Sequence, residues 1–361
     1  MNGLISVGDQ IESGIYRFHS RFNRVVNFER HGRLVSVVDE QIGPGPLNIV
    51  LQGLTPYVRP EATFVSTPPQ RGETRHEAMV NRLNGFDAGS QTAEAVNHPW
   101  RRPSTSSRRD VNLTGAADLG GGGEMAGLDQ LPPLKITTSS VVFSAYRFPF
   151  SPRQRYHSTL DFVPGNLHCF HHNLSIFGEL LTECAPSKSL AFLLDETRLK
   201  NFRSGFEQAF ADRICRGAHQ VFHGHLLEGI RSLKGCGLGL TPSGDDFIAG
   251  LLIALNLLQE LRGQAFQPTA DAIFGAAEGD NIFSNTFLDL ARRGLLFGRM
   301  KDLLIELMTG SEASVRKATG KLLAIGASSG ADLATGFFLT VHEQSRPVER
   351  GCQRQPMDRI G

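Results

Sequence analysis

Two short segments of this chain carry side chains that can do acid–base chemistry where a helix begins. They are Thr241–Asp246, which reads Thr-Pro-Ser-Gly-Asp-Asp, and Ser328–Asp332, which reads Ser-Ser-Gly-Ala-Asp. In both, a Ser-Gly pair is followed by an aspartate three positions after the serine and by a glycine four positions later. The repeated pattern predicts two helices that begin in the same way.

Steps of three and four residues return to the same side of a helix, so the serine, aspartate and glycine share one face. We expect Ser243 to be an N-cap residue, with Asp246 reaching back in a capping box, and the same arrangement in the second segment. Gly250 and Gly336 carry no side chain on that face. We therefore expect the two helices to cross there and to bring both N-termini toward one pocket.

Such a pocket combines two kinds of group. Helix N-termini offer free N–H groups that bind phosphate or carboxylate. Aspartates repel a bare anion, so they suit a ligand that also carries N–H donors, or a divalent cation such as Mg²⁺ that bridges carboxylate and phosphate. The candidate catalytic residues are Asp245, Asp246 and Asp332, and the candidate substrate- or phosphate-binding residues are Gly239, Thr241, Ser243, Gly244, Ser328, Ser329 and Gly330. The alternative is two capped helices that pack through glycines.

Helices must position both segments. From about Leu174 apolar residues recur at intervals of three and four, including a run from Phe202 to Ile230. Further helices are expected at Ser243–Arg262, Thr269–Leu290, Met300–Met308, Glu312–Leu323 and Ser329–Glu343.

The first part of the chain has the alternation and β-branched composition of strands. A turn at His31-Gly32 separates two of them. The expected strands are Ile15–Ser20, Arg24–Phe28, Leu34–Val38, Leu47–Leu51, Ile136–Phe143 and Tyr156–Val163. The fold class is therefore α+β, with a β-rich N-terminal domain (1–65 and 134–170) followed by a mainly helical domain (171–345) that carries the Gly/Asp motifs. Residues 66–133, rich in Pro, Gly, Ser and Arg, are expected to be a disordered insertion, and 346–361 a flexible tail.

Composition excludes several classes of protein. The formal net charge is +1, which argues against a nucleic-acid or anionic-membrane surface. The apolar run Phe247–Leu258 is too short to span a bilayer, so no membrane partner is expected. The five cysteines form no C-x-x-C pair, and Met1–Gly8 lacks a basic region followed by an apolar run. We expect a cytoplasmic protein with reduced thiols.

The segment Gly237–Leu252 resembles the signature of the AllH-like family, formerly a domain of unknown function, and Leu323–Leu333 resembles its second block. Asn281–Leu288 lies where the family has a Ser/Thr-rich helix segment, which adds Asn285 and Thr286 to the substrate-binding candidates. Segments near Phe18 and Gly45 also fit, so the resemblance covers nearly the whole chain except the insertion and the tail. In two places the chain departs from the family pattern. The family often has Gly-Pro-Gly before the Thr-Pro, whereas this chain has Gly237-Leu238-Gly239 followed by Leu240, and Ala327 stands where a histidine is expected.

This resemblance implies a subunit of an oxamate carbamoyltransferase, which converts oxalurate and phosphate to oxamate and carbamoyl phosphate in anaerobic purine (allantoin) catabolism. The expected partners are a small anionic substrate and other subunits of the same enzyme. Two other classes stay open: a non-catalytic subunit that binds a small anion or acts as a scaffold, and a different small-molecule enzyme on the same scaffold. The pair of aspartates favours chemistry, while Ala327 favours binding alone.

Other motifs are weaker. Arg292-Arg293 could pair with a substrate carboxylate or lie on a solvated helix face. No G-x-S-x-G, Walker A or dinucleotide motif is present. Histidines with spacing seen in zinc sites are better explained as surface or capping residues, so no metal ligand is assigned; they are His168, His171, His172, His219, His223 and His225.

Overall fold

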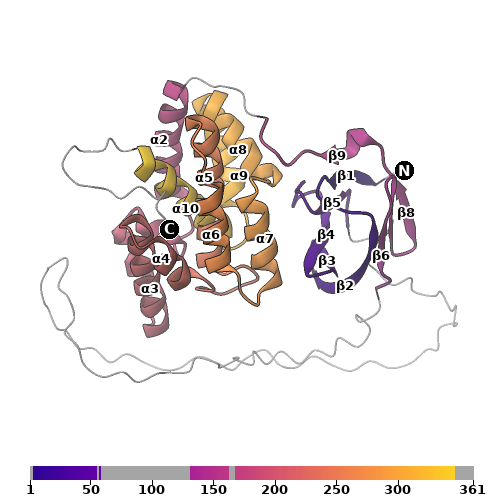
Figure 1. The fold of residues 1–361 in the computed structure, drawn as a ribbon, viewed down its shortest axis with the longest axis horizontal. Coiled ribbons are helices and arrows are strands. Elements are labelled where there is room, and N and C mark those ends of the chain that lie inside the picture. Colours follow the sequence, from indigo (N-terminus) through magenta and orange to yellow (C-terminus); the bar gives the residue numbers. More distant parts are fainter. Residues whose placement is uncertain (1–2, 55–56, 58–130, 162–166, 346–361) are drawn as a thin grey trace, which may run out of the picture. The chain divides into compact units, whose positions relative to one another are not determined.

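The computed structural model describes residues 3–54, 57, 131–161 and 167–345 (Figure 1). Almost all of the expected insertion at 66–133, and the whole expected tail at 346–361, lie outside these residues. The domain boundaries drawn from the sequence therefore stay a prediction. Within the described residues, a sheet is followed along the chain by helices, which confirms the α+β class.

The described strands form one sheet with the order β8-β7-β6-β2-β3-β4-β5-β1-β9. Neighbours are antiparallel except for β4 with β5 and β1 with β9, which are parallel. The strands are β1 (Leu4–Gly8), β2 (Gly14–Phe22), β3 (Val25–Arg30), β4 (Arg33–Asp39), β5 (Asn48–Leu51), β6 (Leu134–Ile136), β7 (Ser140–Phe143), β8 (Tyr146–Pro149) and β9 (Arg155–Tyr156).

The turn expected at His31-Gly32 is confirmed. Both residues have positive φ, 53° and 73°, as a two-residue type I′ hairpin requires, and Arg30 pairs with Arg33 across it. One face of the sheet is apolar, with Phe28 and Phe143 in edge-to-face contact at 5.9 Å between ring centroids.

Two expected strands differ in the structure. The run Ile136–Phe143 is divided between β6 and β7, because the Thr137 hydroxyl accepts a hydrogen bond from Ser140 N at 3.0 Å and closes a turn between them. The strand expected from Tyr156 to Val163 is wrong for the described residues, since β9 ends at Tyr156. Ser158 instead binds the Asp9 carboxylate through its amide and its hydroxyl, at 2.9 and 2.8 Å.

The helical region is built around one helix, α5, which is apolar on nearly all sides and packs most extensively against α10. Among the described helices no segment has both the length and the apolar character needed to cross a membrane. The helices are α2 (Leu167–Cys184), α3 (Gly205–Phe222), α4 (Leu226–Leu233), α5 (Ser243–Arg262), α6 (Gln267–Ala277), α7 (Ile282–Arg292), α8 (Gly298–Thr309), α9 (Glu312–Leu323) and α10 (Ser329–Ser345).

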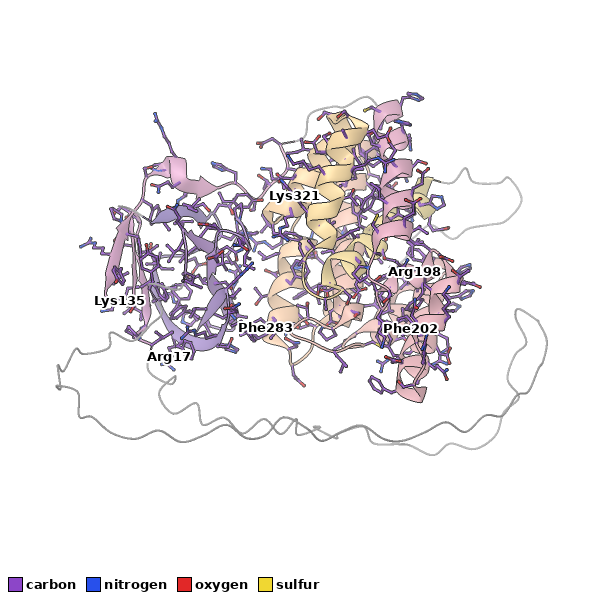
Figure 2. The ribbon with its side chains drawn as sticks, turned by 180° about the vertical axis from the view of Figure 1, so that it is seen from behind. Arg17, Lys135, Arg198, Phe202, Phe283 and Lys321 are labelled. Carbon is purple, nitrogen blue, oxygen red and sulfur yellow. The ribbon has the colours of Figure 1, made fainter. Side chains whose placement is uncertain are left out.

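The bounds expected for α5 and α9 are confirmed, whereas the helix expected at Thr269–Leu290 is wrong. It is broken into α6 and α7 at residues 278–281, because the Asn281 carboxamide accepts from Phe283 N and Ser284 N and so begins a new helix. Phe202, labelled in Figure 2, precedes α3 and packs on Phe192, with 5.1 Å between ring centroids.

Candidate functional site

The helices α5 and α10 cross at the two predicted glycines. A Cβ atom on Gly250 would lie 2.0 Å from the Leu333 carbonyl oxygen, and one on Gly336 would lie 2.1 Å from the Phe247 carbonyl oxygen. No side chain fits such a gap, so glycine is required for the two backbones to approach. The predicted crossing is confirmed.

A second pair of glycines fixes how each helix begins. A Cβ atom on Gly244, at the start of α5, would lie 2.0 Å from the carbonyl oxygen of Leu233, the last residue of α4. Gly330, at the start of α10, has the same relation to the carbonyl oxygen of Leu322 in α9, also at 2.0 Å. The chain therefore uses the same helix–loop–helix construction twice.

The crossing brings the carboxyl group of Asp246 to the start of the other helix. Asp246 accepts a hydrogen bond from the Ser329 hydroxyl of α10. It also accepts one from the Thr241 hydroxyl, with 3.2 Å between Oγ1 and Oδ2. Asp246 is 2% exposed, so these hydroxyls replace water around it.

Asp332 stands in the reciprocal position. The hydroxyl groups of Ser243, in α5, and of Ser328 lie beside its carboxyl group and lower its pKa. Leu190 N, at the start of a short 3-10 helix (Leu190–Leu193), donates to Oδ1 at 2.6 Å. Asp332 is 0% exposed, and no hydrogen bond of good geometry reaches its Oδ2 atom. Each helix thus offers its first serine to the aspartate of the other.

Burial makes both carboxyl groups hold protons more tightly than ordinary aspartates. Desolvation raises the pKa of Asp332 from 3.8 to about 6, although the Leu190 amide and the two serine hydroxyls lower it. Desolvation raises the pKa of Asp246 well above 3.8, and the negative charge of Asp332 raises it further, against the effect of Ser329 and Thr241. Repulsion between two charged carboxylates opposes ionisation of both groups, and the Leu190 amide, 2.6 Å from Asp332 Oδ1, stabilises the charged form of Asp332, so Asp332 is the one that ionises first.

The predicted capping box is wrong. Pro242 is the N-cap of α5, Ser243 is the first helical residue, and no side chain caps the helix. The Asp246 carboxyl faces hydroxyl groups from Thr241 and Ser329. A proline at the N-cap leaves the serine hydroxyl free to reach Asp332.

The expected set of free backbone N–H donors at α5 is also wrong. Gly244 N donates to Cys236 O at 2.8 Å, and the amides of Asp245 and Asp246 donate to Pro242 O at 2.9 and 3.0 Å. The loop before the helix therefore satisfies these amides internally. The start of α5 therefore offers carboxyl and hydroxyl groups, and these three backbone amides are not available to bind an anion.

Four other candidate site residues have different surroundings in the structure. The Asp245 carboxylate accepts from Gly235 N at 2.7 Å and so braces the loop before α5. The Asn285 side chain binds the backbone of Gly279 through both of its polar atoms, at 3.0 and 2.6 Å. Gly239 is exposed with a φ of 113°, and the Thr286 hydroxyl is buried without a hydrogen-bond partner. Asp245 acts on the Asp246–Asp332 pair only through its charge, which raises the pKa of Asp246, and the other three residues form no hydrogen bond or ion pair with the two aspartates.

The arginines are already paired. Arg292 binds Asp289 at 2.8 Å and Asp271 at 2.5 Å, while Arg293 binds Asp289 at 3.4 Å and Gln10 at 2.7 Å.

The histidines and acids do not assemble a metal centre in the part of the chain that the structure describes. There, no group of three or more His, Cys, Asp or Glu side chains is arranged to hold a metal ion. His219 and His223 stack ring on ring at 3.9 Å. His225 lies 3.5 Å from Glu228.

Leu190 was missed by sequence reasoning. Its amide is the strongest partner of Asp332, yet it lies far away along the chain and in a short 3-10 helix without a motif of its own. The Ser189 hydroxyl accepts a hydrogen bond from Ala191 N and so caps this helix, but a capping serine by itself does not point to Asp332.

Comparison with known proteins adds one finding. Residues 233–341 match the family described as oxamate carbamoyltransferase subunit AllH. This stretch contains both motif segments and the helix crossing, so the resemblance that they indicated is confirmed there. Searches of curated proteins and of solved structures found no match.

Proposed function

We propose that this chain is a subunit of an oxamate carbamoyltransferase that converts oxalurate and phosphate to oxamate and carbamoyl phosphate. The observation that carries the proposal is the Asp246–Asp332 pair, two buried carboxyl groups of unequal proton affinity inside the stretch that matches the family. The proposal places the reaction in the cytoplasm, in the anaerobic breakdown of allantoin, and in an assembly with other subunits.

The proposed reaction needs one proton to be removed and one to be supplied. An oxygen of hydrogen phosphate attacks the carbamoyl carbon of oxalurate, the new C–O bond forms, and the C–N bond to oxamate breaks. In this proposal Asp332, the more acidic carboxyl group, accepts the phosphate proton. Asp246 gives its proton to the departing oxamate nitrogen, and transfer of a proton from Asp332 to Asp246 restores the pair.

The hydroxyl groups have a role in the same proposal. Thr241, Ser243, Ser328 and Ser329 are half-buried around the two carboxyl groups. Oxalurate carries ureido N–H groups that can replace these hydroxyls as donors to the carboxyl oxygens. Asp246 and Asp332 are only 2% and 0% exposed, so turnover then requires these four hydroxyl-bearing residues to move aside and admit the substrate.

That near-complete burial also favours a second candidate function. If the four hydroxyl groups keep the carboxyl groups covered, the pair only stabilises the packing of α5 against α10, and the chain is a non-catalytic subunit of the enzyme. In this case the carboxyl groups serve stability alone.

An assay of carbamoyl phosphate formation from oxalurate and phosphate separates the two functions. The chain is assayed in complex with its co-expressed neighbouring gene products, as wild type, Asp246→Asn, and Asp280→Asn as an exposed control. We expect Asp246→Asn to lower kcat by about 100-fold or more, as loss of a general acid does, while Asp280→Asn keeps it. Activity of Asp246→Asn in proportion to its folded fraction would leave only the non-catalytic function.

A further inference from the structure

A groove with an excess of positive charge lies away from the carboxyl pair. It consists of two neighbouring hollows, of about 360 Å³ and about 290 Å³, that share Glu40, Gly43, Pro44 and Tyr156. We call it the basic groove; its cationic side chains are Arg299, Lys301 and Lys321 in the larger hollow and Arg153 and Arg155 in the smaller one.

Backbone contacts hold the walls of the basic groove in place. Gly298 N, at the start of α8, donates to Pro44 O at 2.8 Å, and a Cβ atom on Gly298 would lie 2.9 Å from Pro44 Cγ. The Arg299 guanidinium donates to Gln41 O at 2.5 Å and to Lys321 O at 3.2 Å. The hollow is thus a built feature with defined walls.

The cations differ in how far they are already satisfied. Lys301 Nζ donates to His157 O at 2.9 Å and lies 5.9 Å from the centre of the Tyr156 ring. The side chain of Lys321, in the last turn of α9 and labelled in Figure 2, has no hydrogen bond or ion pair with the residues that the structure describes, and neither has the side chain of Arg153. These two side chains are free to bind an anion.

The chemistry of the lining defines the ligand. Five cationic side chains face two carboxylates, Glu40 and Asp302, so an anionic group is favoured. The start of α8 adds its positive dipole end to the larger hollow. Carboxylates among cations accept hydrogen bonds, so they suit a ligand that carries hydroxyl or N–H donors beside its anionic group. A hollow of about 360 Å³ has the size of a small-molecule site.

We propose that the basic groove binds a small phosphate-bearing metabolite, with the phosphate at Arg299, Lys301 and Lys321 and its hydroxyl or N–H donors at Glu40 and Asp302. The site is separate from the carboxyl pair and does not depend on the proposed function.

Calorimetric titration of the full chain with ribose 5-phosphate and with inorganic phosphate tests this site. Lys321→Gln removes an unpaired cation, and Lys317→Gln, an exposed lysine one turn earlier on α9, is the matched control. We expect one ribose 5-phosphate per chain, bound more tightly than inorganic phosphate. Lys321→Gln should weaken binding of both probes about tenfold or more, and Lys317→Gln should leave it unchanged.

Three results would overturn the proposal. They are no binding of either probe at millimolar concentration, equal losses in Lys321→Gln and Lys317→Gln, and tighter binding of an acidic peptide than of ribose 5-phosphate. The last result would assign the groove to a partner protein.

Discussion

The first turns of α5 and α10 have the same construction but carry different side chains. Both begin with Ser-Gly, both pack that glycine on the carbonyl of a preceding helix, and both place an aspartate against the serine of the other. At α5, Thr241 adds a hydroxyl to Asp246; at α10, Leu190 N adds a backbone amide to Asp332. An N–H donor at 2.6 Å stabilises a carboxylate more than a hydroxyl at 3.2 Å does. A repeated backbone thus yields two carboxyl groups with unequal proton affinities.

The largest expected effect comes from disrupting the crossing of α5 and α10. Gly250→Ala places a methyl group 2.0 Å from the Leu333 carbonyl oxygen, so the helices must separate. We expect the free energy of unfolding to fall by more than about 3 kcal/mol, at the upper end of overpacking effects. Chemical denaturation measures it.

Gly320→Ala in α9 is the matched control, because no atom lies within 4 Å of the added Cβ. It should raise the free energy of unfolding by up to about 1 kcal/mol through helix propensity. Equal behaviour of the two variants would show that the crossing does not depend on glycine.

The next effect is the pH dependence of the stability that Asp332 contributes. The folded protein holds the Asp332 proton more tightly than the unfolded chain does, since the pKa rises from 3.8 to about 6. This contribution to stability is fully present below pH 3.8 and is lost as pH rises through about 6. Asp332→Asn lacks it. The free energy of unfolding of wild type minus that of Asp332→Asn should therefore fall by about 2 kcal/mol between pH 4 and pH 7. A difference that is constant with pH would mean that Asp332 titrates normally.

A smaller effect compares the two serines. Above pH 6, and below the higher pH at which Asp246 ionises, the Ser243 hydroxyl faces a charged Asp332 while the Ser329 hydroxyl faces a neutral Asp246, and hydrogen bonds to charged groups are worth more than those to neutral ones. Ser243→Ala should then cost about 1 kcal/mol more than Ser329→Ala in urea denaturation. At pH 4, where both carboxyl groups are protonated, the two costs should agree. Equal costs at both pH values would contradict unequal ionisation.

Sequence spacing was sufficient to predict the crossing, because Gly250 and Gly336 each follow an aspartate by four residues on one helix face. It was also sufficient for the extent of α5, whose apolar run is long and continuous. These features depend on local periodicity, which a single sequence contains.

Contacts between distant residues could not be predicted in the same way. The role of Asp246 was misassigned to a capping box, because its partner Ser329 comes from another helix. The hydrogen bonds from the α5 amides to Cys236 O and Pro242 O depend on how the loop before α5, which contains Gly235, Gly237 and Gly239 with positive φ, folds back. The break between α6 and α7 was hidden because Asn281 is a capping residue inside an otherwise helical apolar pattern.

The titration of the two carboxyl groups tests the central claim most directly. Carbon-13 NMR of aspartate-labelled protein, with Asp246→Asn and Asp332→Asn to assign the signals, follows both groups through pH. The account predicts that Asp332 titrates near pH 6 and Asp246 at a higher pH, and that removing the Asp332 charge lowers the pKa of Asp246. Titration of both groups near pH 4, with no effect of either variant on the other, would contradict a buried, coupled proton-holding pair.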